Sequence, residues 1–432
     1  AAAVIAATLA LFKAQRAGTG TRKPWFGANA KTLATKPDPS SVTATAYRGI
    51  AVLQAGGIGT AFRQYLKQTR FDTLHVLHSV PFAVMVSFGL LNLVASLSSP
   101  GPMYDTPLYP TTSQMLQSIQ GSYTWLLMIV VMFYGGELVW RERSAKLDGV
   151  VDAFPMPNWV PLAAKATALV AVVAVFMAAA AFWCMGYQLL KGYTALEPLL
   201  YLKGLMLASA LFVLTGWLAI VFQVLCNHKF LGYLATIGIM VSWMVLGSLD
   251  FDHNLVSFGS APAVPYSDMN GYGHFVTGWA WFTSYWTLFT LAGLLIAAAF
   301  WVRGTAEPLR TRVAIAKTRL SGRSGMLLAG SMVATVATGA WILYNTTVLN
   351  RYQASDTALD EQARYETTWR KTEDLPQPRI IATDNTVQIY PAERRVSIDG
   401  QYRMKNKTTQ PIPELLVYGD VDLDMVAGPS EI

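Results

Sequence analysis

The sequence predicts an all-α polytopic membrane protein. Of its 432 residues, 53% are hydrophobic and only 14% are charged, which is too apolar for an ordinary soluble domain. Because bare backbone polar groups are not tolerated in hydrocarbon, each apolar run of about 20 residues is expected to be a membrane-spanning helix. Seven such runs are found, at residues 74–96, 121–140, 160–190, 199–225, 230–249, 278–302 and 326–345.

The two ends of the chain are expected to belong to a longer polypeptide. Residues 1–12, AAAVIAATLALF, are apolar but too short to span, so we interpret them as the remnant of an upstream transmembrane helix. Residues 13–57 are rich in Gly, Thr, Ala, Ser and Pro, which is typical of a flexible linker. The last residues stop within a β-like sequence.

Lysine and arginine gather in alternate loops and so predict the orientation of the chain. Residues 13–70 hold ten of them against a single Asp, and residues 303–323 hold six against a single Glu, which predicts a cytoplasmic location for both. Residues 97–119 and 250–276 contain Asp but no Lys or Arg and are predicted to lie outside. The basic residues behind the net charge of +7 therefore flank the spans instead of clustering on one face, and no nucleic-acid partner is expected.

The residues just before the first span have the pattern of an interfacial helix. Apolar and basic side chains alternate at roughly helical spacing, which suits a helix lying in the headgroup layer of the lipid bilayer. An ordinary cytoplasmic helix packed on protein is the alternative. The residues concerned are Phe62, Tyr65, Leu66 and Phe71, with Arg63, Lys67 and Arg70.

The segment between the second and third spans is the most specific stretch of the chain. A short charged helix is predicted over residues 141–153, ended by Pro155 and Pro157. Tied to a span at each end, such a helix could push on both spans when a partner grips it; a solvated charged turn is the alternative. Its apolar face is predicted to contain Leu147, Val150, Val151 and Phe154.

The external segment at residues 250–276 is predicted to be a compact cap, because its glycines permit left-handed turns and its aromatic rings can fill a small core. Its polar side chains could gate the release of a substrate, or simply hold a turn together. The candidate gate residues are Tyr266, Asp268, Asn270 and His274.

Few charges fall within the apolar runs. Lys165 and Lys203 lie near span ends, where snorkelling to the interface is the simpler explanation. Glu137 is the best candidate for a buried ion pair, with a basic residue of the 141–154 segment as the expected partner. His75 and His78 share a helix face, which could ligate haem or a metal, although interfacial hydrogen bonding explains them adequately.

The chain after the sixth span divides into three parts. Residues 303–325 are predicted to be a basic cytoplasmic linker, residues 326–345 the seventh span, and residues 346–432 an external stalk followed by the start of a β domain. We expect a helix near residues 350–370. Strands are predicted at 386–390, 395–404 and 413–417, with turns at Asp399-Gly400 and Asn406-Lys407.

The stretch GELVWRERSAKLDGVVDAFPMPNW, residues 136–159, resembles the corresponding segment of type-2 ABC exporter permeases, and the layout of residues 58–302 is similar to their six-helix bundle. The resemblance implies that the 141–154 helix is a coupling helix docking on a separate ATP-binding subunit. ATP-driven closure of two such subunits would then alternate access across the membrane. The implied docking residues are Glu142, Arg143, Lys146 and Asp148, with Phe154 wedged into a groove of that subunit.

The ATP and its magnesium are expected on the partner, since the chain has no G-x-x-x-x-G-K-[ST] phosphate-binding loop. A second permease half or a second copy of the chain would complete the path. The resemblance also implies the bacterial inner membrane, with the carboxy-terminal region periplasmic. The apolar, Trp-rich spans fit a lipid-like, peptide or natural-product substrate equally well.

The sequence from Asn385 to Tyr418 is similar to the opening strands of the amino-terminal β domain of gluzincin-class zinc aminopeptidases. This resemblance implies a peptidase fused after Ile432, where any zinc would bind, because the chain has no H-E-x-x-H and no catalytic residues of its own are predicted. The alternative to an exporter is a membrane anchor or scaffold for an external zinc peptidase without transport. A third hypothesis is a haem-bearing electron-transfer subunit that uses His75 and His78.

Overall fold

The computed structural model describes residues 57–98, 109–249, 251–301, 303, 308–350, 352–391, 393, 395–412 and 415–416. It divides into two compact units, Ala1–Tyr352 and Gln353–Ile432. The helix remnant predicted at residues 1–12 and nearly all of the linker predicted at 13–57 lie outside the described residues.

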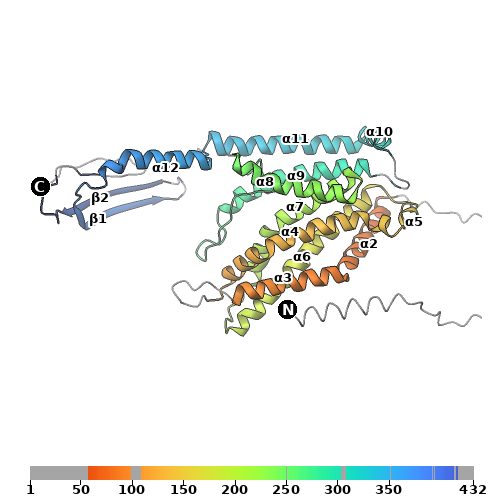
Figure 1. Ribbon diagram of the computed structural model, residues 1–432, viewed down its shortest axis with the longest axis horizontal. Coiled ribbons are helices and arrows are strands. Elements are labelled where there is room, and N and C mark those ends of the chain that lie inside the picture. Colours follow the sequence, from red (N-terminus) through yellow and green to blue (C-terminus); the bar gives the residue numbers. More distant parts are fainter. Residues whose placement is uncertain are drawn as a thin grey trace, which may run out of the picture. The chain divides into compact units, whose positions relative to one another are not determined.

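Among the described residues, seven helices are long and apolar enough to cross a membrane, so the prediction of a polytopic helical membrane protein is confirmed at that level (Figure 1). Each predicted apolar run corresponds to one of them. The helices are α3 (Val80–Ser98), α4 (Thr112–Ser144), α6 (Trp159–Leu190), α7 (Pro198–Cys226), α8 (Lys229–Ser248), α9 (Phe275–Phe300) and α11 (Arg323–Leu343), the last continued by a π-helical turn, Tyr344–Val348.

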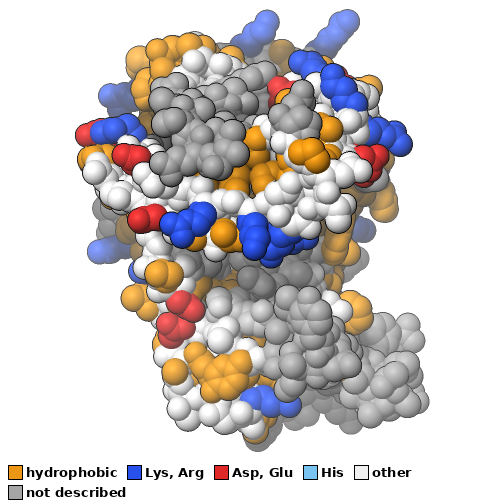
Figure 2. Space-filling view, turned by 90° about the vertical axis from the view of Figure 1, so that its left-hand side faces the viewer, with side chains coloured by type: hydrophobic (Ala, Val, Ile, Leu, Met, Phe, Trp, Pro, Cys, Tyr) orange, Lys and Arg blue, Asp and Glu red, His pale blue; other side chains and the backbone are white. Residues whose placement is uncertain are grey.

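The centre of the bundle is formed by α4, α6 and α7, each with about half of its apolar window buried, whereas α8 and α11 bury only 12% and 17%. Small residues let the central helices approach closely, since a Cβ on Gly216 of α7 would collide with Leu169 of α6. In the end-on view of Figure 2, hydrophobic side chains lie beside Lys, Arg, Asp and Glu side chains. Many large apolar side chains are exposed, among them Phe88, Trp125 and Phe230. Such a surface suits contact with lipid.

The start of the first predicted span differs from the structure. The run predicted at 74–96 is interrupted after Leu77, where helix α2 (Ile58–Leu77) ends, and α3 begins at Val80. Pro81 follows at the first turn of α3, where its missing N–H costs no hydrogen bond. Residues 74–77 therefore belong to the helix before the span. The sequence did not reveal the break because apolar residues lie on both sides of it.

The basic linker predicted at 303–325 contains a helix, α10 (Leu309–Leu320). In the second unit, the helix predicted near 350–370 is found as α12 (Ser355–Trp369) with a following 3-10 turn, Arg370–Thr372. An antiparallel hairpin of β1 (Arg379–Tyr390) and β2 (Arg395–Lys405) comes next.

The turn predicted at Asp399-Gly400 is wrong, since both residues lie inside β2, where Gly400 pairs with Asn385. The predicted third strand, 413–417, lies largely outside the described residues. Register places the apolar side chains on one face of the hairpin, where Val387 faces Ile398 across the two strands.

Candidate functional site

Helix α4 ends in charged residues just before the connection to α6, which we define as residues 145–158. The last helical residue is Ser144, and Lys146 adopts a left-handed conformation with φ 55°. Arg141 and Arg143 lie in the final turn, where cations are favourable beside the negative end of the helix dipole. Only a short helix, α5 (Asp148–Val151), follows. The continuous helix predicted over 141–153 is therefore wrong, because the left-handed residue ends it.

Four charged side chains from three helices form a network behind this connection. Arg141 Nη2 donates to Asp72 Oδ1 at 2.5 Å and to Glu142 Oε1 at 2.9 Å. Lys165 Nζ donates to the same Glu142 oxygen at 2.7 Å and lies 3.8 Å from Asp72 Oδ2. The network (Asp72, Arg141, Glu142 and Lys165) joins α2, α4 and α6 and has no net charge.

Burial makes this network important for the stability of the bundle. The side chains of Asp72 and Lys165 are 0% and 1% exposed, against 13% for Arg141 and 16% for Glu142. Charges taken out of water at such positions require both a partner and hydrogen bonds, and loss of one partner is strongly destabilising. The three helices are therefore held together at this end of the bundle by interactions that leave little freedom for one to move alone.

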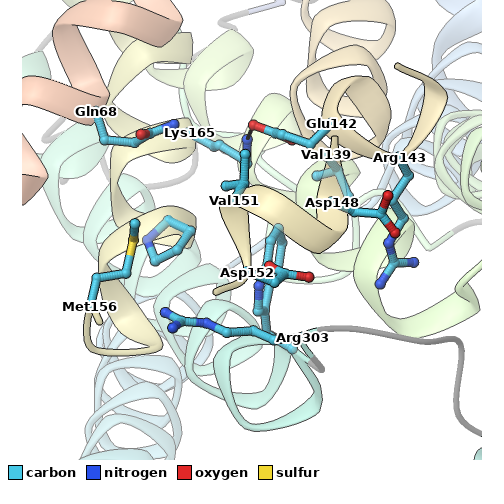
Figure 3. A pocket seen from close by; sticks show the side chains of 12 residues that line it. Gln68, Val139, Glu142, Arg143, Asp148, Val151, Asp152, Met156, Lys165 and Arg303 are labelled. Atoms are coloured by element: carbon cyan, nitrogen blue, oxygen red, sulfur yellow. Dashed lines mark hydrogen bonds and ion pairs between the residues drawn. The ribbon is translucent and has the colours of Figure 1, made fainter. Parts of the chain in front are cut away.

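A small cavity lies between the network and the connection (Figure 3). Glu142 and Lys165 point toward each other on one side of it, and Asp152 and Arg303 lie on the other. Its volume of about 30 Å³ has room for about two water molecules. The cavity is thus too small to hold a transported molecule.

The backbone of the connection is held by side chains from outside it. Arg303 donates to Phe154 O at 3.4 Å and to Pro157 O at 3.2 Å. Gln64 of α2 donates to Pro155 O at 3.1 Å. These bonds fasten both α2 and Arg303, three residues after the end of α9, to the connection.

The outer side of the connection presents apolar side chains. Leu147, Val150 and Phe154 are 53%, 63% and 54% exposed, and we call these three the apolar trio. Val151, predicted on the same face, instead lines the cavity. The trio lies outside the seven candidate spans, where exposed apolar side chains mark contact surfaces.

The structure separates the predicted docking residues into two groups. Glu142 belongs to the network, and Arg143 donates to Asn227 Oδ1 at 2.7 Å, so both are engaged within the bundle. Lys146 and Phe154 are exposed, while Asp148 is half-buried at the cavity. The docking role itself stays a prediction.

Two expectations about charges in the spans are corrected. Glu137 pairs at 3.0 Å with Lys229, the first residue of α8, rather than with a basic residue of the connection, and both side chains are about one-third exposed. Lys165 does not snorkel to the interface, because its ammonium finds two carboxylates inside the bundle. Lys203 is exposed, as expected of a snorkelling side chain.

Two arginines of α10 bind the carbonyl ends of neighbouring helices, and with Arg303 we call them the arginine clamp. Arg312 is only 5% exposed and donates to Val224 O at 2.6 Å, with longer bonds to the ends of α7 and α9. Arg319 donates to Trp301 O at 2.6 Å. Burial lowers the pKa of Arg312, and the nearby Arg143 lowers that pKa further. These guanidinium groups satisfy carbonyls left unpaired at helix ends.

The candidate gate residues lie on or beside one tight turn, Ser267–Gly271. Ser267 N donates to Gly271 O at 2.9 Å, and Gly271 and Gly273 have the left-handed φ values that such a turn needs. Tyr266 packs edge-on against Tyr272, with ring centroids 5.2 Å apart. Asp268 and Asn270 are exposed on this turn, and His274 is exposed directly before α9. The gate role remains a prediction.

The same external segment contains a half-buried histidine, His253. Its Nδ1 accepts a hydrogen bond from Leu255 N at 3.1 Å, which assigns the ring proton to Nε2, 3.1 Å from Thr346 Oγ1. Burial lowers the pKa of His253 from its ordinary value. This contact joins the external segment to the end of α11 and favours the neutral imidazole.

His75 and His78 are both exposed near the end of α2. His78 Nδ1 lies 2.7 Å from Leu74 O, and the His75 ring stacks on Phe71. Across the part of the chain that the structure describes, no group of three or more His, Cys, Asp or Glu is placed to hold a metal ion.

Sequence reasoning did not identify Asp72 as a member of the site, although a lone acid in a basic helix and a lysine in an apolar run were its visible signals.

The chain was compared with protein-family models, with curated proteins and with solved structures, and none of them matches it.

Proposed function

We propose that this chain is a transmembrane subunit of an ATP-driven exporter and that the α4–α6 connection is the docking point for a separate ATP-binding subunit. The observation that carries the proposal is the apolar trio, exposed outside the spans on a segment held firmly from behind. A partner that buries apolar side chains gains binding energy from that burial. A fastened segment also transmits a push instead of deforming.

The path of such a push follows from the contacts of the connection. Its movement would act directly on α4 and α6, the helices at its two ends. The charge network joins these helices to α2, and the Glu137–Lys229 pair joins α4 to α8, so the push would also reach α2 and α8. Alternating access needs movement of helix groups relative to one another. ATP and magnesium would be bound by the partner, and a second copy or permease half would complete the path.

The test is association with the ATP-binding subunit in the intact membrane complex. Val150→Asp and Phe154→Asp place charges at the proposed contact, and we expect loss of co-purifying ATP-binding subunit and of membrane ATPase activity. Leu309→Asp is the matched control, since Leu309 is also an exposed apolar side chain, at 65%, but lies on α10. A V150D chain that retains its full complement of ATP-binding subunit, or a wild-type complex without any ATPase, contradicts the proposal.

A second candidate function, an anchor for an external zinc peptidase without transport, is favoured by the hairpin of the second unit. One face of this hairpin is apolar and more than half exposed. A two-stranded hairpin needs a further layer to be independently stable, so more of a β domain is expected to cover this face. Peptide hydrolysis in membranes that is unaffected by removal of ATP, with no ATP-dependent transport, would favour the anchor over the exporter. The face is formed mainly by Val387, Ile389, Val396, Ile398 and Tyr402.

A further inference from the structure

Helix α2 has a fixed rotation because one of its faces is fastened to the bundle. Tyr65 OH lies 2.8 Å from Thr167 Oγ1 of α6, and its ring packs near Trp159. Gln64 bonds to the backbone of the connection, and Asp72 is buried in the charge network. The opposite face of α2 is therefore always directed away from the bundle.

That outer face combines apolar side chains with positive charge. Phe62, Leu66 and Phe71 are 53%, 50% and 59% exposed. Three exposed cations lie among them, Arg63, Lys67 and Arg70, and none of the three pairs with a carboxylate within the described part of the chain.

The outer face of α2 also lacks negative charge. The only acidic residue of α2 is Asp72, whose side chain is 0% exposed and already paired with Arg141. The exposed surface of this helix therefore carries cations without any anion to offset them. A polyanionic surface is its natural electrostatic complement.

The position of α2 matches this composition to a membrane surface. The helix is joined by only two residues, His78 and Ser79, to α3, which is a candidate span. Figure 1 shows α2 running at an angle to α3 and at the same end of the bundle as α5 and α10. A helix beside a span end, with apolar side chains and unpaired cations, can insert its rings at the acyl boundary while its cations meet lipid phosphates.

We propose that the outer face of α2 is a binding surface for anionic phospholipid at the membrane surface on this side. The two-residue link to a candidate span holds this face close to a span end, where anionic headgroups offer both negative charge and an apolar layer beneath it. Near an anionic membrane, three such cations are expected to favour binding on the order of 100-fold over a neutral one. The proposal does not depend on an ATP-binding partner.

The test compares the full chain in nanodiscs of phosphatidylcholine alone and of phosphatidylcholine mixed with phosphatidylglycerol, with amide hydrogen exchange as the measurement. We expect exchange in residues 58–77 to slow several-fold in the anionic discs. The triple variant R63Q/K67Q/R70Q should lose this difference. The charge-matched control R364Q/R370Q/K371Q removes three exposed cations from α12 and the turn after it, and should keep it.

Two further arms identify the ligand. High salt should abolish the protection in anionic discs, because it screens charges at the membrane surface. Inorganic phosphate added to phosphatidylcholine discs should not reproduce the protection, since it offers no surface for Phe62, Leu66 and Phe71. Equal exchange in both kinds of disc, or a triple variant that behaves as the wild type, overturns the proposal and leaves this face to a protein partner. The measurement involves no ATPase, so its failure is distinct from failure of the exporter proposal.

Discussion

Replacement of Lys165 by methionine is expected to destabilise the helical bundle by about 3 kcal/mol, at the lower end of the range for breaking a buried ion pair. The Lys165 side chain is 1% exposed, and its ammonium lies 2.7 Å from Glu142 and 3.8 Å from Asp72. Its loss leaves the network with one uncompensated negative charge. The cost stays at the lower end because both carboxylates keep Arg141, at 2.5 and 2.9 Å, and Glu142 remains 16% exposed.

A second substitution separates the charge imbalance from the loss of the lysine itself. In Lys165→Met/Glu142→Gln the remaining pair, Asp72 and Arg141, is balanced, so the double variant should be more stable than K165M alone. Contacting residues of one network are expected to show such non-additivity, by about 0.5–3 kcal/mol. Methionine roughly preserves the volume of the lysine stem, so packing changes little.

The assay is unfolding of the full chain in mixed micelles with increasing dodecyl sulfate, followed by far-ultraviolet circular dichroism. Lys203→Met is the matched control, because Lys203 also lies near the start of a span but is exposed, and its replacement should change stability by less than about 0.5 kcal/mol. If K165M and K203M unfold alike, or if the double variant is less stable than K165M, the charge network does not hold the three helices together.

Two further predictions concern packing and pH. Gly216→Ala should destabilise the bundle by about 1–3 kcal/mol, because the added Cβ would collide with the fully buried Leu169, whereas Gly186→Ala meets open space and should be neutral or slightly stabilising by the same unfolding assay. Burial lowers the pKa of His253, so the unfolded chain binds more protons, and the free energy of unfolding should fall as the pH drops below the ordinary value of 6.5. In thermal melts across pH, His253→Gln should abolish that fall, whereas the control His75→Gln should preserve it.

The spans could be predicted because their signal is local. About 20 consecutive apolar residues are enough to indicate a membrane helix, whatever the rest of the chain does. The break between α2 and α3 escaped prediction because Leu74 and Val76, at the end of α2, extend the apolar run of the span. Val76 is apolar because it packs inside the bundle, not because it lies in the span. Local composition indicates what can enter a membrane and says little about where a helix bends.

The charge network could not be predicted for the opposite reason. Asp72, Glu142 and Lys165 are separated by many residues, and only the packing of three helices brings them together. A lysine near a span end looks the same in sequence whether it turns outward, as Lys203 does, or inward, as Lys165 does. The end of α4 depends on a single backbone dihedral at Lys146, which the neighbouring charges do not reveal.

The arginine clamp bonds to main-chain oxygens, and this has a consequence for how the chain tolerates change. Val224, Leu225 and Trp301 contribute their carbonyls, so other side chains at these positions would leave the bonds to Arg312 and Arg319 in place. These bonds therefore depend on the path of the backbone. An inserted residue, a proline or a rotation of either helix about its axis would break them, whereas substitutions of side chains at these helix ends would leave them intact.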